Sequence, residues 1–298
     1  MPLKANIFKY LKNACAKLRS RLFTLMPSFK TLLQEINQRE ARRADRYLIL
    51  HRGQGDLVEC HLSCSSMFCR SLVTCGYLTQ QQMEHASSRY RLGMSRDGGV
   101  IFWQISRSGT VYDGKIMYYR PDCHRDHHRH PTWVSAELKR FYLSPDDELN
   151  EVIQPAHSLF GLHLLQAAGQ EGSAEHSEEK RDKTVAVVES EKTAVICSEL
   201  FPDYFWMATG GLSELSASKL LSLRGWKIIL FPDTDPEGTA YRTWYQVAHE
   251  AEWLLGHPVT VSPLLEQHAT PTQKAAKIDL VDLLSQGSEA RPQKSSHS

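Results

Sequence analysis

The chain has 298 residues, of which 41% are hydrophobic and 23% are charged, and its formal net charge is +1. This balance is typical of a globular protein with a sizeable core. The sequence contains no apolar run of the roughly 18–20 residues that a membrane span needs and no signal-peptide pattern at its start, which argues against membrane and secreted classes. We therefore expect a cytoplasmic protein without a membrane partner, whose seven cysteines are reduced thiols.

Residues 1–50 are predicted to form a basic amphipathic helical arm. Residues 1–46 hold eleven Lys or Arg against three Asp or Glu. Apolar residues recur three or four positions apart from Phe8 to Leu25, and Pro27 is expected to end the first helix. Such a stripe usually docks on a neighbouring domain or partner helix, and nucleic acid or a membrane surface is the alternative.

Cysteine and histidine clusters raise the question of a metal. The spacing of Cys60, Cys64, Cys69 and Cys75 lacks the tight Cys-x2-Cys pairs of structural zinc sites, which favours buried thiols over zinc. The stretch 123–130 holds four histidines and one cysteine. We interpret it as a solvated surface loop rather than a metal site.

An α+β module is predicted at residues 71–167. A short helix begins at Gln80, and strands at 100–105 and 115–119 flank a turn at 106–109. A further helix is expected to start at Ser158. The polar stretch 168–183 is interpreted as a linker.

Residues 184–285 alternate between strand and helix patterns. Strands are predicted at 185–189, 205–209, 227–231 and 259–262, and helices at 190–200, 214–222 and 239–255. This alternation indicates an α/β fold with a parallel sheet that helices cover on both faces. Residues 286–298 are expected to form a disordered tail.

Three acids follow two of these predicted strands. Glu189 ends the first strand, while Asp233 and Asp235 come directly after the third. Carboxylates at the carboxyl ends of parallel strands suit a Mg²⁺ site, and Mg²⁺ acts on phosphates. An Asp-x-Asp-Pro-x-Gly stretch alone is also a common polar turn, so the combination of the two strand ends carries the prediction.

The motifs at 187–189, 208–211 and 231–238 resemble those of the Toprim domain, a catalytic fold of bacterial-type primases, topoisomerases and some nucleases. The order of upstream features is similar to that of the bacterial primase catalytic core. More narrowly, the chain resembles primase-like Toprim proteins of Bacteroidetes chromosomes and mobile elements, over roughly residues 71–285. This narrower resemblance rests on the stretches 89–93, 102–105, 114–119 and 189–194.

The resemblance implies a Rossmann-like Toprim domain preceded by a small primase-core-like module. It implies that Glu189 acts as a general acid or base or helps to hold metal, and that Asp233 and Asp235 hold Mg²⁺, with Mn²⁺ as a substitute. The implied function is nucleotidyl transfer on single-stranded DNA, in replication or transfer of a mobile element. Nucleotides and a helicase or other replication protein would be partners. A Toprim nuclease and a catalytically silent nucleic-acid-binding adaptor are the alternatives.

Basic residues interleaved with aromatic ones between Arg89 and Arg129 suit a nucleic-acid backbone, although aromatic residues in strands are more often core. The cations expected to contact nucleic acid are Arg91, Lys115 and Arg125.

Four further residues are candidates near the acids. Lys192 would neutralise phosphate or form an ion pair, and Gly238 would leave room for a phosphate at a helix start. Asp279 and Asp282 resemble the late acidic stretch of primases, although Asp279 is also a candidate helix N-cap. Ser190 replaces the glycine that follows the glutamate in many Toprim proteins.

Overall fold

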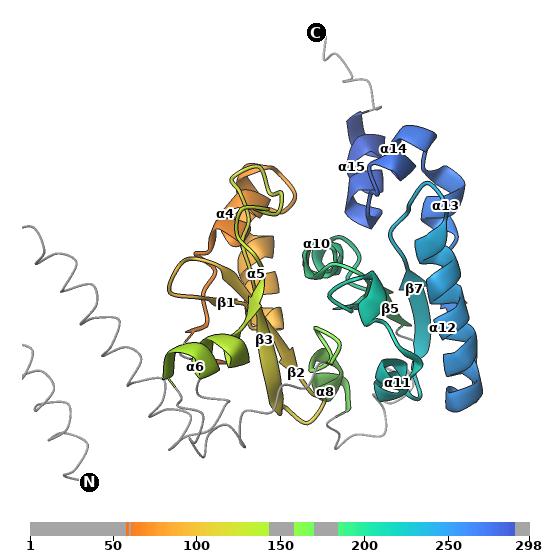
Figure 1. Ribbon diagram of the computed structural model, residues 1–298, viewed down its shortest axis with the longest axis horizontal. Coiled ribbons are helices and arrows are strands. Elements are labelled where there is room, and N and C mark those ends of the chain that lie inside the picture. Colours follow the sequence, from red (N-terminus) through yellow and green to blue (C-terminus); the bar gives the residue numbers. More distant parts are fainter. Residues whose placement is uncertain (1–57, 60, 143–157, 170–183, 290–298) are drawn as a thin grey trace, which may run out of the picture. The chain divides into compact units, whose positions relative to one another are not determined.

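The computed structural model describes residues 58–59, 61–142, 158–169 and 184–289. All of them belong to one compact unit that comprises residues 53–298, drawn in colour in Figure 1. The predicted arm, Cys60, most of the predicted linker and the last nine residues lie outside the described part. Within the described residues, no helix is long and apolar enough to cross a bilayer.

The first part of the unit is an antiparallel sheet with flanking helices. Its strands have the order β1-β2-β3-β4. Its elements are α4 (Met67–Thr74), α5 (Gln80–Tyr90), β1 (Gly93–Met94), β2 (Val100–Ile105), β3 (Val111–Met117), β4 (Thr132–Trp133), α6 (Val134–Tyr142) and α8 (Leu164–Gly169). The predicted helix at Gln80 and the strand 100–105 are confirmed.

Two predictions in this part need correction. The strand predicted at 115–119 begins at Val111, because its first half pairs with β2 and places Gly114 opposite Trp103, where a Cβ would lie 2.7 Å from the indole ring. No helix starts at Ser158. Phe160 instead forms a β-bridge with Ala208, and α8 begins only at Leu164.

The second part is a parallel sheet, as predicted, and its strands have the order β6-β5-β7-β8. Its strands are β5 (Thr184–Val188), β6 (Tyr204–Ala208), β7 (Lys227–Phe231) and β8 (Val259–Val261), with helices α10 (Glu191–Leu200), α11 (Ala217–Leu220) and α12 (Thr239–Leu255). In Figure 1 the strands β5 and β7 lie between α10 on one side and α11 and α12 on the other. The helix predicted at 214–222 is instead α11 flanked by two 3₁₀ turns, Leu212–Glu214 and Leu221–Leu223.

Three short helices follow the sheet: α13 (Leu264–His268), α14 (Pro271–Ala275) and α15 (Leu280–Glu289). The last of them runs past residue 286, where the sequence pattern places the start of a tail. Leu280 and Val281 anchor α15 because they are buried in the same core cluster as α10.

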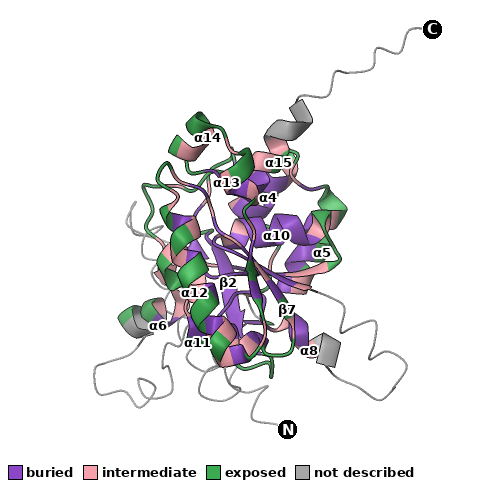
Figure 2. Ribbon diagram, turned by 90° about the vertical axis from the view of Figure 1, so that its right-hand side faces the viewer, coloured by how far each residue is buried: buried purple, intermediate pink, exposed green. Residues whose placement is uncertain are grey.

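Two hydrophobic clusters fill the two faces of the parallel sheet. One joins α4, α5 and β2 to α10 and to the face of β5 that carries Ala186 and Val188. The other packs Val185 and Val187 against α11 and α12. Figure 2 shows buried residues in β2, β7 and α10 and exposed residues along α12. Phe102 and Trp103 are at most 1% exposed, so these aromatic residues belong to the core rather than to a base-stacking surface.

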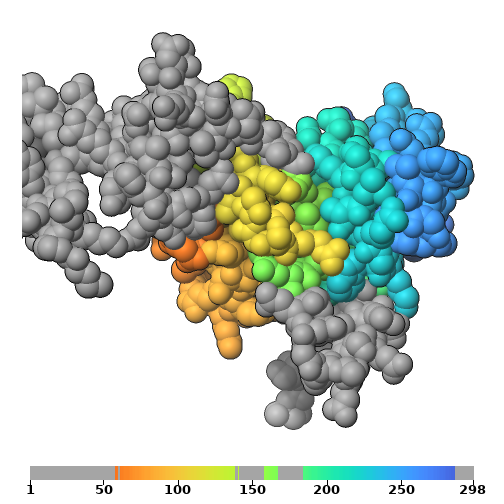
Figure 3. All heavy atoms as spheres, turned by 90° about the horizontal axis from the view of Figure 1, so that it is seen from below, coloured from red at the N-terminus to blue at the C-terminus, as the bar shows by residue number. Residues whose placement is uncertain are grey.

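The antiparallel part covers the outer edge of β6. Phe160 exchanges both backbone hydrogen bonds with Ala208, at 2.9 and 3.1 Å. The Tyr90 hydroxyl donates to the Trp206 carbonyl at 2.8 Å, and its ring stacks on Phe160 with 4.9 Å between centroids. β6 is the edge strand of the parallel sheet, and these contacts give hydrogen-bond partners to backbone groups of Trp206 and Ala208 that would otherwise be unpaired. In Figure 3, where the molecule is seen from below, the orange-to-yellow residues of the antiparallel part lie beside the green and cyan residues that follow them in the sequence.

Replacing Tyr90 with Phe should destabilise the fold by about 1–2 kcal/mol, because a buried carbonyl loses its donor while the packing remains. Urea unfolding of wild type and variant measures this difference. Tyr112→Phe is the control, since Tyr112 is 37% exposed. Equal effects of the two substitutions would contradict a stabilising role for the Tyr90 hydroxyl.

Candidate active site

Glu189 and Asp233 meet at the carboxyl edge of the parallel sheet. Val188, the last residue of β5, pairs with Phe231, the last residue of β7, so the two strands end at the same level. Glu189 follows β5 directly, and the Asp233 backbone N–H donates to its Oε1 at 3.2 Å. Two residues 44 positions apart in the sequence are therefore neighbours.

The environment at these strand ends disfavours ionisation of the Glu189 and Asp233 carboxyl groups. Glu189 is 9% exposed, and burial raises its pKa to about 7; the hydrogen bond from Asp233 opposes this shift, and the charge of Asp235 adds to it. The pKa of Asp233 is also raised well above its usual value. Burial is the largest cause, and the negative charges of Glu189, Asp279 and Asp282 raise it further. Carboxyl groups crowded in this way retain protons or attract a cation.

Asp235 has a different environment. Its carboxylate accepts hydrogen bonds from the backbone N–H groups of Glu237 at 3.0 Å, Thr239 at 3.1 Å and Ala240 at 2.8 Å. Burial acts to raise the pKa of Asp235, but these three donors and Arg242 together lower it. The described residues contain no group of three side chains arranged to hold a metal ion. The structure thus joins Glu189 to Asp233 and commits Asp235 to the start of α12.

Gly238 lies at the start of α12, as expected from the sequence. It adopts a left-handed conformation, with φ 65°, immediately before α12. The first N–H groups of that helix, those of Thr239 and Ala240, already bond to Asp235. Asp235 therefore satisfies these two donors, and a phosphate at Gly238 stays a prediction.

Asp279 and Asp282 begin α15 and face the same edge. The Asp282 N–H donates to Asp279 Oδ1 at 2.9 Å and the Asp279 N–H donates to Asp282 Oδ2 at 3.2 Å, so the two side chains cap the helix reciprocally. Asp279 also accepts from the Thr193 hydroxyl at 2.6 Å. The Thr234 N–H donates to the Ile278 carbonyl at 3.2 Å, which holds this segment beside the loop of Asp233.

Lys192 is the cation of this acidic group. Burial acts to lower its pKa, but the charges of Asp279 and Asp282 raise it above the usual value. Its Nζ lies 5.9 Å from the centroid of the Tyr77 ring. The charge of Lys192 thus offsets those of Asp279 and Asp282, and its expected role at a phosphate stays a prediction.

The three other predicted cations differ in their contacts. Lys115 forms a buried ion pair with Glu191, so its ammonium group is not available to nucleic acid. Arg91 pairs with Glu59. The Arg125 side chain is exposed. Of the three, Arg125 is therefore the best candidate to contact a phosphate.

The cysteine and histidine stretches differ in their exposure. The four histidines of the stretch 123–130 are exposed, as expected for a surface loop. Cys69 is buried, as predicted, whereas Cys64 and Cys75 are exposed. The prediction of buried thiols is therefore wrong for the last two.

Sequence reasoning missed the roles of Glu191, Thr193 and Thr234. Glu191 is 2% exposed and binds a lysine 76 positions away, and Thr193 binds an aspartate 86 positions away. Such contacts leave no local pattern. One signal was present in the sequence: Glu191 and Thr193 lie in the first turn of the predicted helix that follows Glu189.

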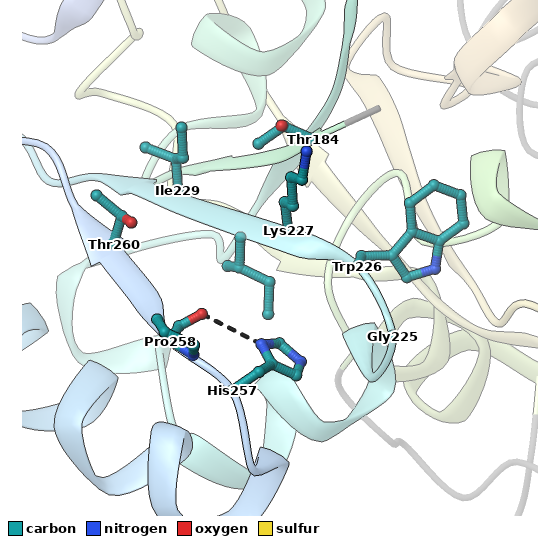
Figure 4. Close-up of a pocket in the computed structure, with 9 residues that line it drawn as sticks. Thr184, Gly225, Trp226, Lys227, Ile229, His257, Pro258 and Thr260 are labelled. Carbon is teal, nitrogen blue, oxygen red and sulfur yellow. Dashed lines mark hydrogen bonds between the residues drawn. The ribbon is translucent and has the colours of Figure 1, made fainter. Parts of the chain in front are cut away.

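A pocket of about 550 Å³ lies at the amino ends of the parallel strands, opposite the ends that carry Glu189 and Asp233. Figure 4 shows its lining at the amino ends of the strands, where Thr184 and Lys227 begin β5 and β7. Glu189 and Asp233 are at the other ends of these strands, about 15 Å away for five residues. The pocket is therefore separate from the acidic edge.

Replacing Glu189 with Gln should change how stability depends on pH. Between pH 4.5, the usual pKa, and about 7, the folded protein binds the Glu189 proton more tightly than the unfolded chain does. Wild-type stability therefore falls as the pH rises through this window. Relative to wild type, Glu189→Gln should be about 1–3 kcal/mol more stable at pH 8 than at pH 5.

Urea unfolding at pH 5 and pH 8 provides the measurement. Glu250→Gln, which alters an exposed acid on α12, is the control and should show no such pH-dependent gain. A Glu189→Gln variant that parallels wild type at both pH values would refute the shifted pKa.

Comparisons with known proteins give a family but no activity. A search of curated proteins finds no match. The primase fragment of the bacteriophage T7 primase-helicase protein is 16% identical, with a TM-score of 0.39 over 68% of this chain and 66% of that one. The DnaG primase catalytic domain bound to ssDNA is 13% identical, with a TM-score of 0.44 over 83% of this chain and 86% of that one. Values this low support no inference about activity.

The sequence itself matches one family model, described as "Domain of unknown function (DUF6371)". The match covers residues 66–234, from the start of α4 to the loop that carries Asp233. Because this is more than half of the chain, the protein belongs to that family.

Proposed function

We propose that this protein is a Toprim-type, primase-like nucleotidyltransferase that acts on single-stranded DNA with Mg²⁺. The observation that carries the proposal is the pair of buried Glu189 and half-buried Asp233, which lie together at the carboxyl ends of two parallel strands. In α/β proteins, ligands bind outside the carboxyl ends of the parallel strands. Replication or transfer of a mobile element, with a helicase or other replication protein as partner, is the setting that this activity would serve.

The acids fit a Mg²⁺ ion that substrate completes. Mg²⁺ in phosphoryl-transfer sites is often bound by one or two carboxylates, with waters and substrate phosphates as the other ligands. Glu189 and Asp233 would supply these carboxylates, and Asp279 and Asp282 add negative charge beside Asp233. When bound, Mg²⁺ or Mn²⁺ neutralises charge on the phosphate oxygens and aligns the reacting groups.

Where Asp233 and the substrate hold the metal without Glu189, Glu189 is instead suited to move a proton. A carboxyl group with a pKa of about 7 can accept a proton from an attacking hydroxyl near neutral pH. Its Oε1 accepts the Asp233 N–H, which leaves Oε2 for that proton. Lys192 would balance charge on the phosphate, and exposed Arg125 would contact the backbone of the DNA.

A catalytically silent nucleic-acid-binding adaptor is the second candidate. The contact of Asp235 with three backbone N–H groups favours it, because this leaves one fewer carboxylate for a metal. Binding of Mn²⁺ measured by calorimetry separates the two candidates. An adaptor would give no metal-dependent heat.

Asp233→Asn should lower primer synthesis at least about 100-fold, because the substitution removes a metal ligand from the reacting centre. The assay supplies single-stranded templates, nucleotides and Mg²⁺ or Mn²⁺. Asp203→Asn, at an exposed position, is the matched control and should retain wild-type activity.

Two outcomes would count against this proposal. Absence of product from wild type on varied templates, with and without a helicase, would reject nucleotidyl transfer. Metal-dependent cleavage of labelled DNA without nucleotides, lost in Asp233→Asn, would instead assign the same acids to a nuclease that activates water.

A further inference from the structure

Lys115 extends from the antiparallel sheet to the acidic edge of the parallel one. It lies in β3, and its Nζ is 3.1 Å from Glu191 Oε1 and 2.8 Å from the Gly210 carbonyl oxygen. The Lys115 side chain is 13% exposed and that of Glu191 is 3% exposed. This is a buried, charge-assisted contact between two parts of the fold.

Both partners of Lys115 connect directly to Glu189. Glu191 lies in the first turn of α10, two residues after Glu189. The Gly210 N–H donates to the Glu189 carbonyl oxygen at 2.9 Å. The ammonium group thus binds the loop after β5 through Glu191 and the loop after β6 through Gly210.

Gly210 shows how closely these loops approach the ammonium group. Its φ is +91°, and a Cβ at this position would lie 3.2 Å from Glu191 Oε1 and 3.3 Å from Lys115 Nζ. The peptide can therefore place its carbonyl oxygen on Lys115 and its N–H on Glu189 at the same time. No other residue type would allow this backbone conformation without strain.

We propose that Lys115 is a positioning residue for Glu189: its ammonium group locks the two loops that hold Glu189 at the sheet edge. A compact ammonium has three donors that can point at separate acceptors, here the Glu191 carboxylate and the Gly210 carbonyl. Buried ion pairs add little net stability but fix geometry. The catalytic meaning of this role rests on the proposed function, whereas the positioning itself does not.

The double variant Lys115→Met/Glu191→Gln provides the test, because it removes both buried charges together and leaves neither unpaired. Hydrogen exchange of the full-length protein, without metal or nucleotide, compares the Gly210 amide with that of Met207 in β6. The Gly210 amide should exchange about tenfold faster, because its local opening becomes easier, while the Met207 amide stays at the wild-type rate.

Mn²⁺ affinity gives a second readout. If Glu189 binds metal, the double variant should bind Mn²⁺ about tenfold more weakly, as expected when a residue that orients a ligand is lost. Lys219→Met is the matched control. It removes the Lys219–Glu214 ion pair, which has the same length of 3.1 Å, but the Glu214 side chain is 47% exposed and is therefore not left as a buried charge. It should change neither the exchange of Gly210 nor the affinity for Mn²⁺.

The outcomes separate this inference from the proposed function. Unchanged exchange at Gly210, or equal acceleration at Gly210 and Met207, would overturn the positioning role. Local acceleration at Gly210 in a protein that binds no Mn²⁺ would support the positioning role and reject the metal-dependent function.

Discussion

The structure depends on an electrostatic constraint at the carboxyl edge of β5 and β7. Parallel pairing places Glu189 and Asp233 side by side, where burial and mutual repulsion disfavour ionisation of both. The surrounding chain offsets part of this cost. The Asp233 N–H bonds to Glu189, and Lys192 lies beside the acids that begin α15. Each of these contacts stabilises an arrangement that the hydrophobic core alone would not favour.

The antiparallel sheet supports this edge from a distance in sequence. Phe160 and Tyr90 satisfy the outer backbone groups of β6, and Lys115 binds the loops that follow β5 and β6. Two of these residues, Tyr90 and Lys115, precede Glu189 by more than seventy positions in the sequence. A parallel sheet without this neighbour would keep its strand order but would leave an edge strand unpaired and the buried charge of Glu191 uncompensated.

Local sequence patterns predicted the parallel sheet well because its strands are short apolar runs between amphipathic helices. The strand at 227–231 was predicted to the residue, and Glu189 and Asp233 followed from their positions after strands. The failures are non-local. Phe160 lies in a helical pattern but pairs with Ala208, and Lys115 resembles a nucleic-acid-binding cation but pairs with Glu191. Neither partner can be identified without the three-dimensional contacts.

The spacing of Asp233 and Asp235 produces two different carboxylates. Asp233 is next to Glu189 and has a raised pKa, whereas Asp235 accepts three backbone N–H groups at the start of α12 and has a lowered pKa. The helix N-terminus keeps Asp235 ionised, and its charge in turn raises the pKa of Glu189. Environments that separate the pKa values of adjacent acids assign them distinct roles. Asp235 therefore contributes to this site through its fixed charge, while Glu189 and Asp233, whose pKa values are raised, are the groups that the proposed function assigns to the metal.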